Sequence, residues 1–270
     1  MELTSPHSRA PDCISDSLIE PQPGTLTSIF ENSDLPESLA SYFQIGLDAG
    51  RACESLIRDL NQLRINHRCI NKLLKLTRRS PDSCRRRASI INHHKACRNL
   101  AAFSVCRNPF TVATGGMFLE MHDAHVLLLG RLTSLHRKTK RRTILIRRFR
   151  HGVAAVLTIG GGALAVARGG GTWVEGLDIA AKGVYILIND FETVSRLVEW
   201  VEEEVDRRKF AAEMCVRRKM EEMLKGVVGE LGTNNGRYGE ELEELEKQTY
   251  LCLFDINRSR RLVLHEIMFH

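Results

Sequence analysis

Residues 177–205 read LDIAAKGVYILINDFETVSRLVEWVEEEV, and this stretch determines the predicted fold. Its apolar side chains recur at alternating steps of three and four residues, the spacing with which one edge of an α-helix meets a partner helix. We call such a line of residues a seam. The members of this seam are Val184, Leu187, Phe191, Val194, Val198, Val201 and Val205. The pattern predicts one long helix over residues 177–228.

The same spacing recurs in three other stretches, residues 39–74, 118–135 and 238–252. The glycine-rich stretch 229–239 predicts a loop before the last of these helices. Only 6% of the residues are aromatic, and alternating β-branched runs are few, which argues against a large β-sandwich or barrel. Facing seams of equal period predict an all-α protein, in which long heptad-patterned helices pack antiparallel in a bundle around a short central apolar segment.

Composition divides the 270 residues into four regions. Residues 1–37 contain five of the seven prolines and seven acids against one arginine, which predicts a disordered acidic tail. Residues 38–150 form an N-terminal helical region that ends in basic residues. Residues 151–176 form an apolar, glycine-rich segment that we expect to associate with a membrane. Residues 177–270 form a C-terminal helical region.

Positive charge is concentrated in residues 124–174, which hold ten Lys and Arg and no Asp or Glu, whereas the rest of the chain has 29 basic and 33 acidic residues. Nine of the ten precede the apolar segment, and the last eight of these form what we call the basic cluster. They are Arg137, Lys138, Lys140, Arg141, Arg142, Arg147, Arg148 and Arg150. Basic residues beside an apolar run are typical of the anionic, cytoplasmic side of a membrane. The alternative is a soluble nuclear or nucleic-acid-associated helical protein that uses the same cluster.

The apolar segment Gly152–Ala167 contains no charged residue, and four of its residues are glycine. As a helix it would measure about 24 Å, against about 30 Å for a hydrocarbon core. Whether the segment spans the membrane, re-enters it or lies on it is open, and the alternative is a buried core helix or a glycine-rich turn. The residues expected to insert are Val153, Val156, Leu157, Ile159, Leu164 and Val166.

Motifs that would indicate catalysis lack their required context. Gly160, Gly162 and Ala165 imitate a dinucleotide-binding turn, but no β-α-β unit surrounds them. The group Cys84, His93, His94, Cys97 and Cys106 matches no zinc-ligand spacing. Asn108-Pro109-Phe110 is either a peptide ligand for an adaptor protein or a turn.

Since none of these motifs has its required context, we expect a protein that is not an enzyme and has no cofactor or metal. Its expected partners are anionic membrane lipids, with helical proteins or further copies of the chain, rather than nucleic acid.

Four stretches carry a resemblance to a known family. They are SYFQIGLDAGRACESLIRDL at 41–60, NPF at 108–110, EMHDAHVLLLGRLTSLHRKTKRR at 120–142 and GLDIAAKGVYILINDFETVSRLVEWVEEEV at 176–205. In this order the chain resembles an uncharacterised plant protein family, some of whose members are described as integrin-like. The resemblance implies a helical, membrane-associated protein with cytoplasmic flanks and no enzymatic activity. We therefore expect a non-enzymatic, membrane-associated interaction or scaffold protein. The family's two apolar spans are replaced here by one short run, followed by Glu175, Asp178 and Lys182.

Overall fold

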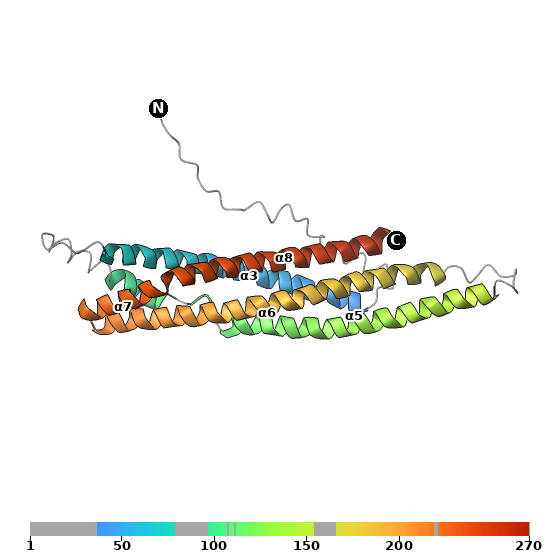
Figure 1. Cartoon of the computed structure of the whole chain (residues 1–270), viewed down its shortest axis with the longest axis horizontal. Helices are drawn as coiled ribbons and strands as arrows, with labels where there is room; N and C mark the ends of the chain where they lie inside the picture. The colour runs from blue at the N-terminus through green and yellow to red at the C-terminus, as the bar shows by residue number, and fades with distance from the viewer. Residues whose placement is uncertain are drawn as a thin grey trace, which may run out of the picture. The chain divides into compact units, whose positions relative to one another are not determined.

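The computed structural model describes residues 37–78, 97–106, 108–110, 112–153, 166–218 and 221–269. Almost all of these residues are helical, and no strand occurs among them, so the predicted all-α fold is confirmed. The long elements are labelled in Figure 1, and residues 97–105 form a further short helix. The labelled helices are α3 (Glu37–Arg78), α5 (Val112–Val153), α6 (Val166–Arg218), α7 (Glu221–Thr233) and α8 (Asn235–Phe269).

The predicted seams form the core of the protein. All seven seam residues of α6 between Val184 and Val205 are buried, as are Tyr238, Leu242 and Leu245 on α8. Removing a Leu or Val side chain from water stabilises the fold by about 1.5–3 kcal/mol. A helix whose apolar residues lie along one edge gains this energy only against a partner helix, so the seams dictate helix-on-helix packing.

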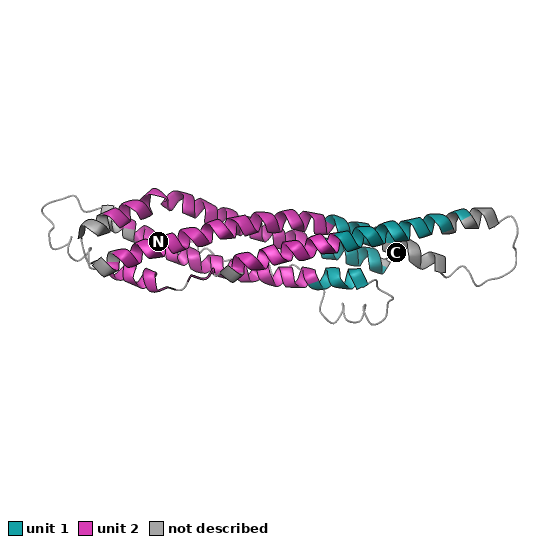
Figure 2. Cartoon of the chain, turned by 90° about the horizontal axis from the view of Figure 1, so that it is seen from below, with its two compact units in different colours: residues 1–44, 130–182, 257–270 teal, residues 45–129, 183–256 magenta. Residues whose placement is uncertain are grey.

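The helices divide into two compact units, which are coloured separately in Figure 2. Unit 1 comprises residues 1–44, 130–182 and 257–270, and unit 2 comprises residues 45–129 and 183–256. The long helices therefore contribute to both units. The four regions predicted from composition follow the chain instead, and their boundaries stay a prediction. The acidic tail, apart from Glu37 at the start of α3, lies outside the described residues.

Unit 2 contains two antiparallel helix pairs. On α3 and α8, Cys53 lies beside Cys252 with the sulfur atoms 3.7 Å apart, and Arg64 forms an ion pair with Glu246. The residue number rises along α3 while it falls along α8, so the two helices are antiparallel. On α5, Gly115 faces the Val198 side chain of α6, whereas the later residue His125 packs on the earlier Phe191 with ring centroids 4.7 Å apart. The predicted antiparallel arrangement is thus confirmed for both pairs.

A second apolar cluster of unit 2 joins the short helix 97–105 to its neighbours. Leu100 is fully buried, and it packs with residues of α3, α6 and α7. The members of this cluster are Ile70, Leu74, Leu100, Ala211, Ala212, Val227 and Leu231. The cluster explains why α7 forms although it is short, because Val227 and Leu231 gain burial only as part of a helix.

Unit 1 contains the beginning of α3, the C-terminal half of α5, the first part of α6 and the end of α8. The hydroxyl groups of Tyr42 and Ser259 share a buried hydrogen bond of 2.5 Å, which joins α3 to α8. Burial raises the pKa of Tyr42 to about 12, so the phenol is neutral at physiological pH. The Nδ1 atom of His136 on α5 lies 3.1 Å from the carbonyl oxygen of Val174 on α6.

Two features of the secondary structure differ from the sequence prediction. The predicted loop at 229–239 is wrong, because these residues are helical in α7 and α8 apart from a bend at Asn234. The buried side chains Leu231 and Tyr238 outweigh a glycine penalty of about 1 kcal/mol per residue. The prediction of a single helix over 177–228 is also wrong. The stretch belongs to two helices, α6, which ends at Arg218, and α7, which begins at Glu221.

Candidate anionic-surface interface

Six members of the predicted basic cluster lie on the surface of the C-terminal half of α5, in unit 1. The side chains of Arg147 and Arg150 lie outside the described residues. The six exposed residues are Arg137, Lys138, Lys140, Arg141, Arg142 and Arg148. The concentration of charge predicted from the sequence is therefore brought together on one exposed stretch of helix.

The inward face of α5 explains why the basic residues point outward. Leu132 is buried, and His136, Thr139 and Thr143 are partly buried at the following steps of three or four residues. The Thr143 hydroxyl donates a 3.0 Å hydrogen bond to the Thr139 carbonyl oxygen, which satisfies the hydroxyl within the helix. Since one edge of the helix is occupied by these residues, the intervening basic residues are left at exposed positions.

Apolar side chains lie among the exposed basic residues. Ile144 is 44% exposed and Leu145 is 52% exposed. Among the described residues, no acidic side chain forms an ion pair with any of the six basic residues. We call these six residues together with Ile144 and Leu145 the α5 basic face. Uncompensated positive charge combined with exposed aliphatic groups is typical of helices that lie at the surface of an anionic membrane.

The residues predicted to insert into the membrane are not placed by the structure. Val156, Leu157, Ile159 and Leu164 lie outside the described residues, and of Val153 and Val166 only the helical backbone is described, at the end of α5 and the start of α6. Within the part of the chain that the structure does describe, no helix is both long and apolar enough to cross a bilayer.

The structure describes only part of the Cys and His group, and none of the three residues that imitate a dinucleotide-binding turn. Cys84, His93 and His94 lie outside the described residues, as do Gly160, Gly162 and Ala165. Cys97 is partly buried and Cys106 is exposed. Across the described ranges, no three His, Cys, Asp or Glu side chains are grouped closely enough to hold a metal ion.

The Asn108-Pro109-Phe110 motif is a turn held in place by the fold. The Asn108 amide donates a 3.0 Å hydrogen bond to Asp206 on α6, and its side-chain oxygen accepts a 3.1 Å bond from the Phe110 backbone N–H. Phe110 is 1% exposed and belongs to the core of unit 2. The adaptor-ligand interpretation is wrong for this conformation, because a peptide ligand would have to present the Phe side chain.

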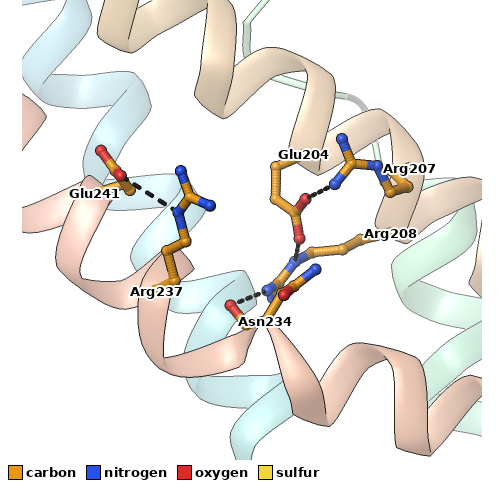
Figure 3. Close-up of polar contacts among 6 residues, drawn as sticks. All are labelled: Glu204, Arg207, Arg208, Asn234, Arg237 and Glu241. Atoms are coloured by element: carbon orange, nitrogen blue, oxygen red, sulfur yellow. Dashed lines mark hydrogen bonds and ion pairs between the residues drawn. The ribbon is translucent and has the colours of Figure 1, made fainter.

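Unit 2 also contains a buried polar group that the sequence analysis did not identify (Figure 3). Arg208 and Glu204 on α6 are each 3% exposed, and Arg208 Nε donates a 2.8 Å hydrogen bond to Glu204. Arg207 also pairs with Glu204 from the solvent side. Arg208 donates a further bond of 3.2 Å to the carbonyl oxygen of Asn234, and its guanidinium carbon lies 4.0 Å from the centre of the Tyr238 ring.

These contacts connect α6 to the bend between α7 and α8. The Asn234 carbonyl oxygen also accepts the backbone N–H of Tyr238 at 3.0 Å, so one oxygen caps the start of α8 and holds Arg208. Burial raises the pKa of Tyr238 and lowers the pKa of His67, whose ring packs on Tyr238, so both side chains are neutral at physiological pH. A pocket beside Glu204 and Arg208 has about 20 Å³ of free volume, enough for one water molecule. These contacts support a structural role for Glu204 and Arg208. The sequence indicates the pair only by an acidic and a basic residue four positions apart.

An all-α, antiparallel helical protein with a basic surface on one helix is thus the class defined by the structure. The chain belongs to the UPF0496 family of plant proteins. It is 30% identical over 301 aligned residues to the UPF0496 protein At1g20180 of Arabidopsis thaliana. The alignment covers 94% of this chain and 76% of the relative. The plant family predicted from the resemblance is confirmed, whereas its integrin-like character stays a prediction.

Two rice sequences are similar over a shorter stretch. The putative UPF0496 protein 2 of Oryza sativa, in both the indica and the japonica subspecies, is 39% identical over 102 residues, which is 37% of this chain and 24% of the rice protein. No model of a protein family matches the chain, and no solved structure is similar to it.

Proposed function

We propose that this protein is a non-enzymatic, membrane-associated helical interaction protein, a scaffold that binds the anionic cytoplasmic face of a membrane. The observation that carries the proposal is the α5 basic face, with six exposed basic side chains around Ile144 and Leu145. Each basic side chain near an anionic leaflet contributes about 1 kcal/mol, and the aliphatic side chains add binding energy when they enter the interface.

The proposed orientation follows from the position of the charge. The basic residues of α5 precede the apolar segment Gly152–Ala167, and basic residues that flank an apolar segment are retained on the cytoplasmic side. The apolar segment is the second part of the proposed anchor, and it contributes independently of charge.

Vesicle sedimentation tests the role of the basic face. The variant replaces Arg137, Arg141, Arg142 and Arg148 by Gln, and vesicles of phosphatidylcholine with and without phosphatidylserine are compared. Losing four charges near the surface removes about 4 kcal/mol of attraction, so binding to the anionic vesicles should weaken by about three orders of magnitude. The matched control replaces four exposed basic residues of α3 and α6 by Gln, and it should bind like the parent. These control residues are Arg68, Lys72, Lys75 and Arg196.

The outcomes separate the two interpretations of the basic cluster. Equal loss in the variant and its matched control would show that binding follows net charge alone and would contradict a specific face. Negligible binding of the parent to both kinds of vesicle, together with salt-sensitive binding to duplex DNA that the variant loses, would assign the α5 basic face to nucleic acid instead.

The apolar segment is tested by a separate variant, Leu157→Asp with Leu164→Asp. If the segment enters the bilayer, the parent should retain part of its binding at high salt, where charge is screened, and the Asp variant should lose that part. Unchanged binding of the Asp variant at high salt would remove the segment from the anchor.

A further inference from the structure

The C-terminal part of α8 carries a second surface of unusual composition. From Lys247 to Met268, eight positions are exposed, and every one of them is basic or apolar. We call these eight residues the α8 stripe. They are Lys247, Leu251, Phe254, Arg258, Arg261, Leu262, His265 and Met268. Apart from the adjacent pair Arg261 and Leu262, they follow one another at steps of three or four residues, which places them along one side of a single helix.

The acids of this part of α8 do not belong to the stripe. Asp255 and Glu266 are only partly exposed, and one carboxylate oxygen of Glu266 is buried. The exposed acids of α8, Glu240 and Glu243, precede Lys247. Lys247 forms a 3.4 Å ion pair with Glu244 within the helix. The surface of α8 therefore changes from acidic to basic and apolar near Lys247.

The apolar members of the stripe are large and accessible. Leu251 is 44% exposed, Phe254 50%, Leu262 49% and Met268 56%. A nucleic acid backbone would satisfy the basic residues but would leave four apolar side chains without a partner. An anionic bilayer offers negatively charged headgroups and hydrocarbon in the same interface, which matches both kinds of side chain.

We propose that the α8 stripe is a second surface that binds anionic lipid, with α8 lying parallel to the plane of the bilayer. The proposal extends the proposed function, because it concerns the same ligand, but it concerns a different helix and different residues. Between Lys247 and Met268 the helix is about 30 Å long, so its basic and apolar side chains contact several lipids at once. This surface is not apparent from the sequence, because buried and partly buried residues separate most of its members along the chain.

The charge of the stripe is tested with Arg258→Gln and Arg261→Gln together. Two arginines near an anionic surface account for about 30-fold in vesicle binding, and the double variant should lose this factor on phosphatidylserine vesicles. The matched control is Arg68→Gln with Lys72→Gln, which removes two exposed charges from α3 and should bind like the parent. Thermal unfolding of each variant should match that of the parent, because all four side chains are exposed.

The apolar part of the stripe is tested with Phe254→Ser and Leu262→Ser together. Both residues are about half exposed, so insertion of their side chains should contribute roughly tenfold to binding, and this part should persist at high salt. The matched control is Leu119→Ser with Leu127→Ser, two exposed leucines of α5 beside the exposed acids Glu120 and Asp123. The control should bind like the parent, because acids oppose contact with an anionic surface.

The two membrane proposals fail in distinguishable ways. If the α5 Gln variant loses binding while both α8 variants bind like the parent, the α8 proposal is wrong and the proposed function stands. If the α8 variants lose binding while the α5 variant does not, the α8 proposal stands and the α5 basic face is not the anchor. If the α8 variants and their matched controls lose binding equally, or the parent binds no vesicle, the α8 proposal is also wrong.

Discussion

Asp190 on α6 and Asp255 on α8 illustrate how single residues set the pH dependence of this fold. Asp190 is partly buried, and one of its carboxylate oxygens is buried without a hydrogen-bond partner. Burial, and secondarily the negative charge of Asp255, raise the pKa of Asp190 to about 6. Since the folded-state pKa exceeds the unfolded value, the protonated carboxyl stabilises the fold at low pH, and this contribution is lost as the pH rises through about 6.

We predict that Asp190→Asn stabilises the protein at about pH 7.5 by roughly 1–2 kcal/mol, a figure reduced for the partial exposure of the site. At about pH 4 the variant and the parent should be nearly equal, because the parent carboxyl is then protonated in the folded state. Urea unfolding at both pH values measures the difference. A stability difference that does not change with pH would contradict the assignment.

The buried pair of Glu204 and Arg208 gives a second prediction at this scale. Arg208→Met should cost about 3 kcal/mol of unfolding free energy, because it leaves the Glu204 carboxylate buried with only the half-exposed Arg207 as a partner. Adding Glu204→Gln to Arg208→Met should recover part of the loss, since the unpaired charge is then removed. Denaturant unfolding of both single variants and the double variant provides the comparison, and strictly additive losses would show that the pair is not coupled.

At the scale of the helix, one seam residue and one exposed residue of α6 form a direct comparison. Phe191 is fully buried against His125 and Phe118, whereas Tyr185 is 62% exposed on the same helix. Phe191→Ala should lower the unfolding free energy by about 3–5 kcal/mol through the cavity it leaves. Tyr185→Ala should change it by less than about 0.5 kcal/mol. Thermal and urea unfolding measure both, and similar effects would contradict the seam assignment.

Gly130, in the middle of α5, allows a stabilising change. It is exposed, its helix continues on both sides, and an added Cβ would meet no atom within 4 Å. Gly130→Ala should therefore raise the unfolding free energy by about 0.5–1 kcal/mol, because alanine loses less chain entropy in a helix. Differential scanning calorimetry would show a higher Tm, and a lower Tm would indicate that α5 is not a regular helix at this point.

The seams could be predicted from the sequence because 3,4 spacing is a property of consecutive residues. Phe191 and Val198 were identified in this way and are fully buried. The ends of the helices could not be predicted, because they depend on contacts distant in sequence. Gly236 and Gly239 indicate a loop by local propensity, yet they are helical because Tyr238 is buried beneath Arg208.

For the whole molecule, the distribution of charge was visible in the sequence only where basic residues are adjacent. The basic cluster of α5 was found because residues 124–174 contain no acid. The α8 stripe was missed, because Arg258 and Leu262 alternate with the buried Ser259 and Arg260, and only the helical register separates the two faces. The burial of the pair Glu204 and Arg208 could not be predicted from the sequence, because it depends on contacts with Asn234 and Tyr238.

The proposed function of the whole molecule depends on its affinity for an anionic membrane surface. The most direct test is the partition of the full chain onto vesicles that contain increasing fractions of phosphatidylserine, measured by sedimentation at low and high salt. We expect binding to rise steeply with phosphatidylserine and to fall by orders of magnitude as salt increases, because several basic side chains act together. Equal binding to neutral and anionic vesicles at low salt, or no binding to either, would contradict the proposed attachment to an anionic membrane surface.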